Sequence, residues 1–136
     1  MLDKVDIQET ISRYHEAGST FDWDRIIATF LPDGIWEVPS LEVRAVGHAD
    51  IRHTMSSLVA GIEYLVQINA PAIIDLDGDR ASARSLVREC AKFRDGGVYL
   101  DVVGQFVDEL RRTSEGWRFA RRTFTALGTH VTEGSA

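Results

Sequence analysis

Hydrophobic residues recur among polar ones along residues 98–124, and this pattern predicts the longest β-hairpin of the chain. β-branched and aromatic side chains recur on both sides of residues 113–116, whose sequence Thr-Ser-Glu-Gly supplies the glycine that a tight turn requires. We therefore expect two long strands joined by this turn, and we expect the preceding residues to extend or cover the hairpin.

The first part of the chain instead shows the three-to-four-residue spacing of helices. One helix is predicted over about residues 3–18, a short second one after Asp22, which is suited to cap it, and a third just after Gly47. The sequence Pro-Asp-Gly at 32–34 is expected to end the second helix. The buried stripes of these helices are expected to consist of Ile7, Ile11, Tyr14 and Gly18, then Trp23, Ile26, Ile27 and Phe30, and then Ile51, Met55 and Leu58 or Val59.

The second half of the chain has the composition and turn signals of β structure. We expect three helices followed by four long antiparallel strands, which is an α+β arrangement with the helices packed on one face of a sheet. Strands of this length twist and curl, so the sheet is expected to enclose a cone-shaped interior. Residues 1–136 are expected to form a single domain in which residues 128–136 are a flexible tail or a flap over the mouth of the cone. The strands are expected at 35–38, 43–46, 64–76 and 81–93 and in the hairpin of 98–124, with turns at Asp77-Gly78 and Asp95-Gly96-Gly97.

Composition narrows the classes of partner. The chain has 136 residues, 44% of them hydrophobic, and a formal net charge of −6, which argues against nucleic acid or an anionic membrane as the main partner. Cys90 is the single cysteine, so no internal disulfide is possible, and no hydrophobic run approaches the length of a membrane span. We expect a cytoplasmic protein that binds neither nucleic acid nor membranes.

Side-chain parity along the predicted strands indicates which residues share a face, because successive side chains of a strand point to opposite sides. In residues 81–93, Arg84, Arg88 and Lys92 share one face while the other is small and apolar, so Glu89 is expected to point inward together with Val87. The same parity groups Leu65 with Gln67 and Asn69, Val102 with Gly104 and Phe106, and Arg122 with Phe124.

The chain carries, in order, the motifs Ile7 with Tyr14, Asp22-Trp23-Asp24 with Phe30 and Asp33, Gly47-His48-Ala49-Asp50-Ile51, Asp77-Gly78-Asp79-Arg80-Ala81, Gly104-Gln105-Phe106 with Asp108, and Gly116-Trp117-Arg118-Phe119 with Arg122. Their order and spacing resemble those of the SnoaL-like branch of the nuclear-transport-factor-2-like (NTF2-like) superfamily. The resemblance implies a mainly antiparallel, mixed sheet that forms a cone, a pocket that opens toward the helical end, assembly as homodimers or homotrimers, and no cofactor. Members of this superfamily include dehydratases, dehydrochlorinases, polyketide cyclases, steroid isomerases and hydrolases, as well as proteins that catalyse no reaction.

The chain departs from the family at the residues that carry the known chemistry. By resemblance, the aspartate and histidine of the dehydratase and dehydrochlorinase dyad correspond to Ser19 and Gln67. The base of the steroid isomerases corresponds to Val38, although their first-helix tyrosine coincides with Tyr14. No established mechanism of the family can therefore be transferred unchanged.

Three residues are the candidate catalytic groups. Glu89 in an apolar cone would have a raised pKa suited to proton transfer, and the alternative is a structural ion pair with Arg122. Tyr14 could donate a hydrogen bond to a developing oxyanion, or it could be an ordinary core tyrosine. Arg122 could anchor a substrate carboxylate or enolate, or it could balance the charge of Glu89. The residues expected to bind the substrate are Ser19, Trp36, Leu65, Gln67, Asn69, Val87, Val102, Phe106 and Phe124.

The histidines do not indicate a metal site. His48 and His53 are five residues apart, which does not put them on one helical face, and His15 and His130 are isolated in the sequence. Three functions remain open. The chain could be a cofactor-independent enzyme that dehydrates, isomerises or cyclises a small apolar, ring-containing molecule. It could bind such a molecule without converting it to a product. It could also be an interaction or assembly module whose outer sheet face is the functional surface.

Overall fold

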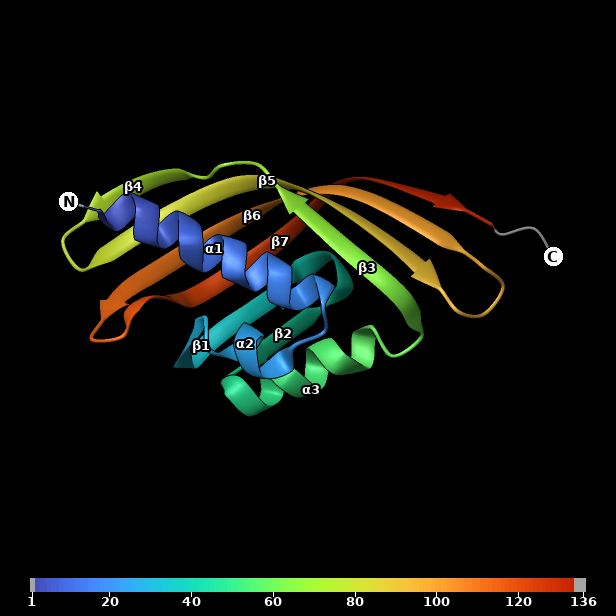
Figure 1. Cartoon of the computed structure of the whole chain (residues 1–136), viewed down its shortest axis with the longest axis horizontal. Helices are drawn as coiled ribbons and strands as arrows, with labels where there is room; N and C mark the ends of the chain where they lie inside the picture. Colours follow the sequence, from blue (N-terminus) through green and yellow to red (C-terminus); the bar gives the residue numbers. More distant parts are fainter. Residues whose placement is uncertain (1, 134–136) are drawn as a thin grey trace.

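Residues 2–133 of the chain are described by a computed structural model, in which helices cover one face of a curved seven-stranded sheet. Helix α1 runs across that face, and α2 and α3 lie together beside β1 and β2 (Figure 1). The elements are α1 Asp3–Ser19, α2 Trp23–Ile27, β1 Phe30–Val38, the 3-10 turn Pro39–Leu41, β2 Val43–Val46, α3 His48–Leu58, β3 Ile62–Asn69, β4 Ile73–Asp77, β5 Arg80–Phe93, β6 Tyr99–Thr113 and β7 Gly116–Thr132.

The strand order is β2-β1-β7-β6-β5-β3, and β4 also pairs with β5. The β6–β7 hairpin is the predicted one and turns between Thr113 and Gly116, where Gly116 has a φ of 110° that favours glycine. All pairings are antiparallel except that of β1 with β7, so the sheet is mixed. Register shifts interrupt the β6–β7 pairing at two points, and such bulges increase the twist that curls the sheet around α1.

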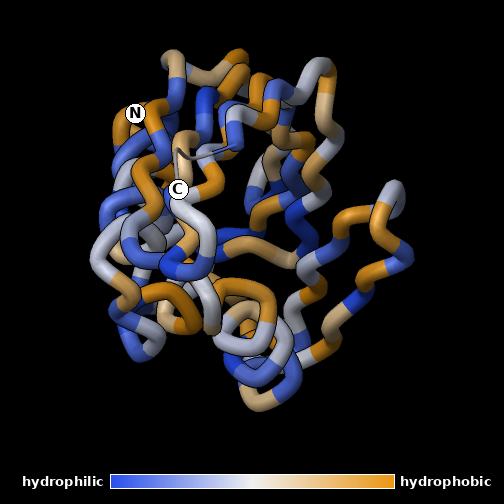
Figure 2. The backbone as a smooth tube through the Cα atoms, turned by 90° about the vertical axis from the view of Figure 1, so that its right-hand side faces the viewer, coloured by the Kyte–Doolittle hydropathy of each residue, from blue (hydrophilic) through white to orange (hydrophobic). Residues whose placement is uncertain are grey.

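The alternation of buried and exposed positions that the sequence predicted is present along the long strands. In β5, every second residue from Ala81 to Val87 is buried, and in β6 the same holds from Val102 to Leu110. Hydrophobic and hydrophilic residues are interspersed along the backbone (Figure 2). Asp22 caps α2 as expected, because its side chain accepts a hydrogen bond from the backbone N–H of Arg25 at 3.2 Å.

The strand predicted over residues 64–76 is in fact two strands, β3 and β4, that pair with different parts of β5. Pro71 lies between them and has no N–H to donate to a neighbouring strand. Helix α1 satisfies the interrupted backbone there: the Gln8 side chain donates to the carbonyl of Ala72 and accepts from its N–H. The prediction of four long strands in simple succession was therefore wrong on this side of the sheet.

Residues 32–34 do not end α2, which already stops at Ile27. They lie inside β1, in the irregular stretch between its two segments that pair with β7, where Phe30 lies beside Phe119 and Ile35 beside Arg121. The prediction that Phe30 belongs to the second helix was wrong. A parallel strand partner far along the chain supplies hydrogen bonds that local spacing cannot anticipate.

Residues 128–132, expected to form a tail or flap, instead continue β7 and pair with β6 from Tyr99 to Val103. Residue 133 follows the strand, and the remaining part of that expectation falls on residues 134–136, which lie outside the described residues. The pairing lengthens the sheet beyond the helices at this end (Figure 1).

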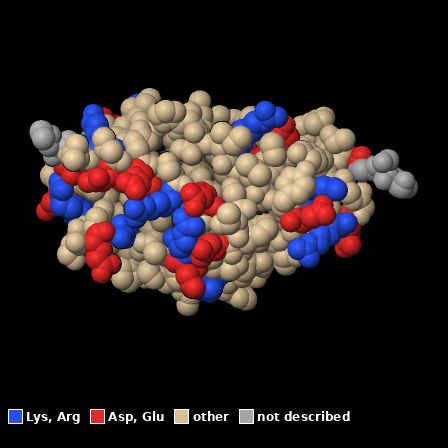
Figure 3. All heavy atoms as spheres, viewed as in Figure 1, with Lys and Arg blue, Asp and Glu red and all other residues tan. Residues whose placement is uncertain are grey.

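On the face that carries α1, acidic and basic side chains lie next to one another rather than in separate patches (Figure 3). Exposed ion pairs such as Arg13 with Glu9 and Arg25 with Glu16, each at 2.7 Å, belong to this pattern. Pairs of this kind contribute about 0–1 kcal/mol each, so the stability of the fold comes from its apolar core. None of the helices within residues 2–133 combines the length and the hydropathy of a membrane span.

Candidate active site

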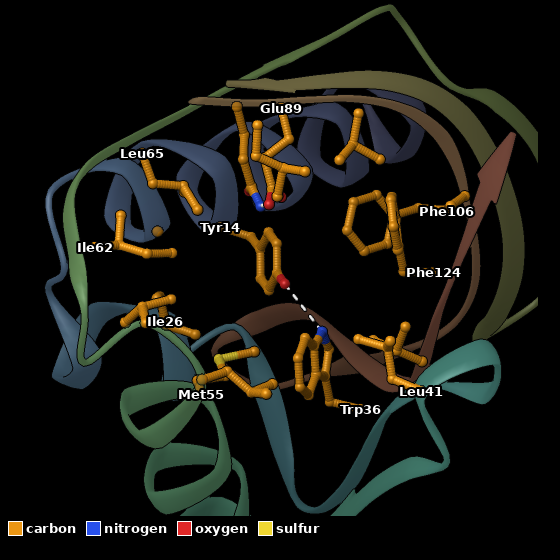
Figure 4. A pocket seen from close by; sticks show the side chains of 18 of the residues that line it. Tyr14, Ile26, Trp36, Leu41, Met55, Ile62, Leu65, Glu89, Phe106 and Phe124 are labelled. Carbon is orange, nitrogen blue, oxygen red and sulfur yellow. Dashed lines mark hydrogen bonds between the residues drawn. The ribbon is translucent and has the colours of Figure 1, made fainter. Parts of the chain in front are cut away.

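A pocket of about 440 Å³ lies between the inner face of the sheet and the helices. Its walls come from nearly every element, and most of its lining is apolar (Figure 4). Glu89 is the single charged residue among the described residues that line it. The principal apolar wall residues are Ile26, Trp36, Leu41, Met55, Ile62, Leu65, Val102, Phe106 and Phe124.

Glu89 enters the pocket from β5, directly opposite Gln67 on β3. The Gln67 amide nitrogen Nε2 donates to Oε2 of Glu89 at 2.7 Å. Burial raises the pKa of the Glu89 carboxyl, and the hydrogen bond from Gln67 opposes part of that rise. The carboxyl group is thereby suited to gain and lose a proton closer to neutral pH than an exposed glutamate.

Tyr14 projects from α1 into the centre of the pocket, where its hydroxyl oxygen accepts a hydrogen bond from Trp36 Nε1 at 3.0 Å (Figure 4). Burial raises the pKa of Tyr14 to about 12, against the opposing effects of the Arg122 charge and the Trp36 bond. The phenol therefore keeps its proton at neutral pH. Among the described residues no acceptor takes this proton, so the O–H can donate to a bound molecule.

His15, the neighbour of Tyr14 on α1, is 2% exposed and contacts two polar groups. Its Nδ1 lies 2.8 Å from Oε1 of Gln67, and its Nε2 lies 3.3 Å from a guanidinium nitrogen of Arg122. Burial and the Arg122 charge lower the pKa of His15 to about 3, with the Gln67 contact acting in the opposite direction. His15 is therefore neutral at physiological pH.

Arg122 pairs with Asp108, its direct neighbour across β6 and β7, and not with Glu89. The bond from Arg122 Nε to Asp108 Oδ1 is 3.0 Å long, and neither side chain is exposed. The guanidinium carbon also lies 3.8 Å from the centre of the Phe106 ring. Burial raises the pKa of Asp108 to about 6, although the charge and hydrogen bond of Arg122 act against the rise.

Arg122 is therefore behind the pocket wall and not in the lining. This arrangement supports neither role considered from the sequence: Arg122 does not reach a substrate carboxylate or enolate in the pocket, and it does not balance the charge of Glu89. The reason is that Asp108 shares the inward face of β6 with Val102 and Phe106 and lies directly across from the arginine.

The structure brings most of the sequence-predicted residues to the pocket. The predicted residues that line it are Tyr14, Trp36, Leu65, Gln67, Glu89, Val102, Phe106 and Phe124.

Ser19, Asn69 and Val87 do not line it. Ser19 Oγ instead accepts the backbone N–H of Gln67 at 3.0 Å, which joins the end of α1 to β3. Asn69 on β3 pairs with Val87 on β5, and each lies two residues along its strand from the Gln67–Glu89 pair. Val87 is part of the core cluster that also contains Ile7 and Ile11 of α1. The pocket therefore ends at the Gln67–Glu89 row.

Sequence reasoning assigned no role to His15, and it cited Asp108 only as part of a family motif. The parity of β6 could have identified Asp108, because it continues the inward series that begins at Val102 and includes Phe106. His15 follows Ile11 by four residues, which puts it on the buried side of the helix, so the view of it as isolated was wrong. Among the described residues, no group of three or more His, Cys, Asp or Glu side chains is arranged to hold a metal ion.

Comparison with known proteins agrees with this architecture. Residues 1–123 match the family described as SnoaL-like domain. No curated protein sequence matches the chain.

Solved structures with the same fold cover nearly the whole chain. A protein from Novosphingobium aromaticivorans, provisionally named an aromatic ring hydroxylase, is 28% identical, with a TM-score of 0.89 over 96% of this chain and 93% of that one. A second protein from that organism, provisionally named a scytalone dehydratase, is 19% identical, with a TM-score of 0.85 over 99% and 96%. A LinA-type3 hexachlorocyclohexane dehydrochlorinase from Novosphingobium barchaimii is 13% identical, with a TM-score of 0.86 over 96% and 90%. The predicted NTF2-like cone of the α+β class is confirmed.

Proposed function

Since this chain belongs to the SnoaL-like family, we propose that it is a cofactor-independent lyase or isomerase that transfers protons on a small, apolar, ring-containing molecule. The observation that carries the proposal is that Glu89 is the single charged side chain among the described residues lining the pocket. Two proteins of the same fold are named as a dehydratase and a dehydrochlorinase, and both names denote eliminations. Dehydration, isomerisation and cyclisation all need one group that can take up and return a proton.

In this proposal Glu89 is the general acid and base. Gln67 binds one carboxylate oxygen, Oε2, and no described residue donates a hydrogen bond to the other, Oε1. The carboxylate points toward the space around Tyr14 (Figure 4), so Oε1 can accept a proton from a ligand held there. Returning that proton to another atom of the same ligand completes an isomerisation, and delivering it to a departing hydroxyl completes a dehydration.

Tyr14 supplies the electrostatic part of the mechanism. Removing a proton next to a carbonyl group develops negative charge on the carbonyl oxygen, and a donor already oriented toward that oxygen stabilises it. The bond from Trp36 fixes the Tyr14 hydroxyl while leaving its proton available.

The proposed ligand is uncharged. The side chains of Trp36, Phe106 and Phe124 form flat walls suited to a ring system. Since Arg122 is sealed behind Phe106, no described cation reaches the pocket to neutralise an acid. At about 440 Å³, the pocket is within the range of small-molecule sites.

A pair of fluorescent probes tests the ligand class. We expect 2-naphthol to bind, and we expect 2-naphthoate, which has a similar ring system and a negative charge, to bind at least about tenfold more weakly at pH 8. Glu89→Gln should narrow that difference. Equal affinity for both probes, or tighter binding of the naphthoate, would contradict the proposed pocket chemistry.

Proton transfer can be measured without knowing the natural substrate. In deuterium oxide, the protein should accelerate exchange of the acidic C1 hydrogens of 2-tetralone, followed by proton NMR. Glu89→Gln should lower the protein-catalysed rate about 100-fold or more, since general-base catalysis contributes about 10²–10⁴. An unchanged rate in this variant removes Glu89 from the chemistry.

A binding protein without turnover is the alternative, and the residues at the family's dyad positions favour it. By resemblance these positions hold Ser19 and Gln67, neither of which is a base at neutral pH. Saturable binding of 2-tetralone by the wild-type protein with no exchange above the buffer rate would establish this alternative.

A second copy of the chain is the proposed partner. The outer face of the sheet exposes apolar side chains on three adjacent strands: Val66 and Ile68 on β3, Leu86 on β5, and Val103 and Val107 on β6. Burying such a surface between two copies removes it from water. Sedimentation velocity should give a dimer or trimer, and Leu86→Glu should shift the distribution toward monomer.

A further inference from the structure

A line of hydrogen-bonded side chains crosses the protein from β6 to the pocket. It runs from Asp108 to Arg122, His15, Gln67 and Glu89, and the successive contacts are 3.0, 3.3, 2.8 and 2.7 Å long. Its members come from α1 and from four different strands, so only the folded chain assembles it. The first three members lie outside the pocket lining and the last two belong to it.

The chemistry of the groups gives this line a direction. The guanidinium of Arg122 only donates, so Nε2 of His15 must accept. The ring is neutral because the pKa of His15 is lowered to about 3, so its proton is on Nδ1, which donates to Oε1 of Gln67. The amide of Gln67 is thereby oriented with its NH₂ group toward Glu89.

We propose that His15 is a positioning residue that holds the Gln67 amide in the orientation that donates to Glu89. If the amide turned over, its carbonyl oxygen would face the carboxylate, and the two acceptors would repel each other unless Glu89 were protonated. His15 therefore controls how readily Glu89 ionises without touching the ligand. The inference rests on the proposed role of Glu89 as acid and base.

The other groups near Glu89 do not replace this control. The titratable and charged side chains of this buried region, besides Glu89, are those of Tyr14 and His15 on α1, Asp108 on β6 and Arg122 on β7. Tyr14 stays neutral, and Asp108 and Arg122 bind each other. Gln67 is the one described residue that hydrogen-bonds the carboxylate.

The unmodified protein supplies the first test. Nitrogen-15 NMR of the imidazole rings should show His15 as the neutral Nδ1–H tautomer throughout pH 5–8. Assignment follows from the loss of its signals in His15→Asn. An Nε2–H tautomer, or protonation of His15 near pH 6, would overturn the proposal without reference to any activity.

Two variants of matched position supply the second test. His15→Leu removes both ring nitrogens, whereas His15→Asn keeps an N–H donor near the place of Nδ1. The titration of the Glu89 carboxyl is followed by carbon-13 NMR and assigned by Glu89→Gln. The midpoint should rise by about one pH unit in His15→Leu and remain near the wild-type value in His15→Asn.

Equal midpoints in the wild-type protein and the leucine variant would refute the proposal, and so would equal shifts in both variants. Near-ultraviolet circular dichroism reports whether the leucine variant is folded. If it is not folded, the tautomer of His15 in the unmodified protein decides whether the proposal holds. These readouts are independent of the 2-tetralone exchange. A protein in which Glu89→Gln leaves exchange unchanged, but whose NMR results are as expected, would lose the proposed function and keep the positioning network.

Discussion

Arg122 and Asp108 form an ion pair that is closed off from solvent, with Arg122 Nε donating to Asp108 Oδ1 at 3.0 Å and neither side chain exposed. The guanidinium lies over the rings of Tyr14, Phe106 and Phe119 at 4.2, 3.8 and 4.6 Å from their centres. Two of these rings are pocket walls. The pair therefore supports the back of the pocket while its charge stays out of it.

Removing one member of this pair should destabilise the protein more than removing both. Asp108→Leu leaves the Arg122 cation buried without its counter-charge, which should lower the free energy of unfolding by about 3–5 kcal/mol. The double variant Asp108→Leu with Arg122→Met should recover most of that loss. Urea denaturation of the four proteins in the cycle measures the coupling. If the two single losses simply add, the pair is not coupled.

The stability of the protein should fall as the pH is lowered through the range in which unfolded histidine titrates. The pKa of His15 is about 3 in the folded protein and 6.5 as its ordinary value, so between these values the unfolded state binds the extra proton. Going from pH 7 to pH 5 should cost about 2 kcal/mol through this residue.

His15→Asn isolates this contribution, because it lacks the titrating ring. Asp108 acts in the opposite sense, since its pKa is raised from 3.8 to about 6 and its contribution falls as the pH rises through that interval. It is present in both proteins, so the difference between their pH profiles reports His15. Parallel profiles would show that His15 titrates in the folded state as it does in the unfolded one.

Tyr14→Phe should have two separable effects. The indole N–H of Trp36 loses its acceptor, which should cost about 1–3 kcal/mol of unfolding free energy. The 2-tetralone exchange rate should fall about 10²–10³-fold, as when one donor to a developing oxyanion is removed. Tyr99→Phe, on the outer face, is the control and should leave the exchange rate unchanged. Loss of stability with full exchange activity would reduce Tyr14 to a core residue.

Gly104 is required for the position of one pocket wall. A Cβ added there would lie 2.5 Å from two ring carbons of Phe124 and 2.8 Å from the carbonyl oxygen of Thr125. Gly104→Ala should therefore displace Phe124, lower stability by about 1–3 kcal/mol and weaken 2-naphthol binding.

Gly128→Ala is the matched control in the neighbouring strand, because its nearest contact is the Val103 side chain at an acceptable 3.4 Å. Thermal unfolding and probe titration of both variants should separate them. Similar effects at the two glycines would mean that Phe124 relaxes without changing the pocket.

The sequence alone indicated much of this protein, because the relevant patterns are local. Apolar spacing located the three helices, and turn residues located the hairpins of the last three strands. Strand parity put Glu89 on the inward face, since the alternation of side chains depends only on the extended backbone. The order of motifs was sufficient to identify the family.

Only the tertiary structure decided which polar groups meet. His15 and Arg122 are 107 positions apart in the chain and Gln67 and Glu89 are 22 apart, and their contacts depend on strand register and on where α1 crosses the sheet. The same packing buries Arg122 in an ion pair with Asp108, and it makes the row of Gln67 and Glu89 the end of the pocket. Helical spacing and strand parity describe one element at a time, whereas a hydrogen-bonded site is a property of how several elements pack.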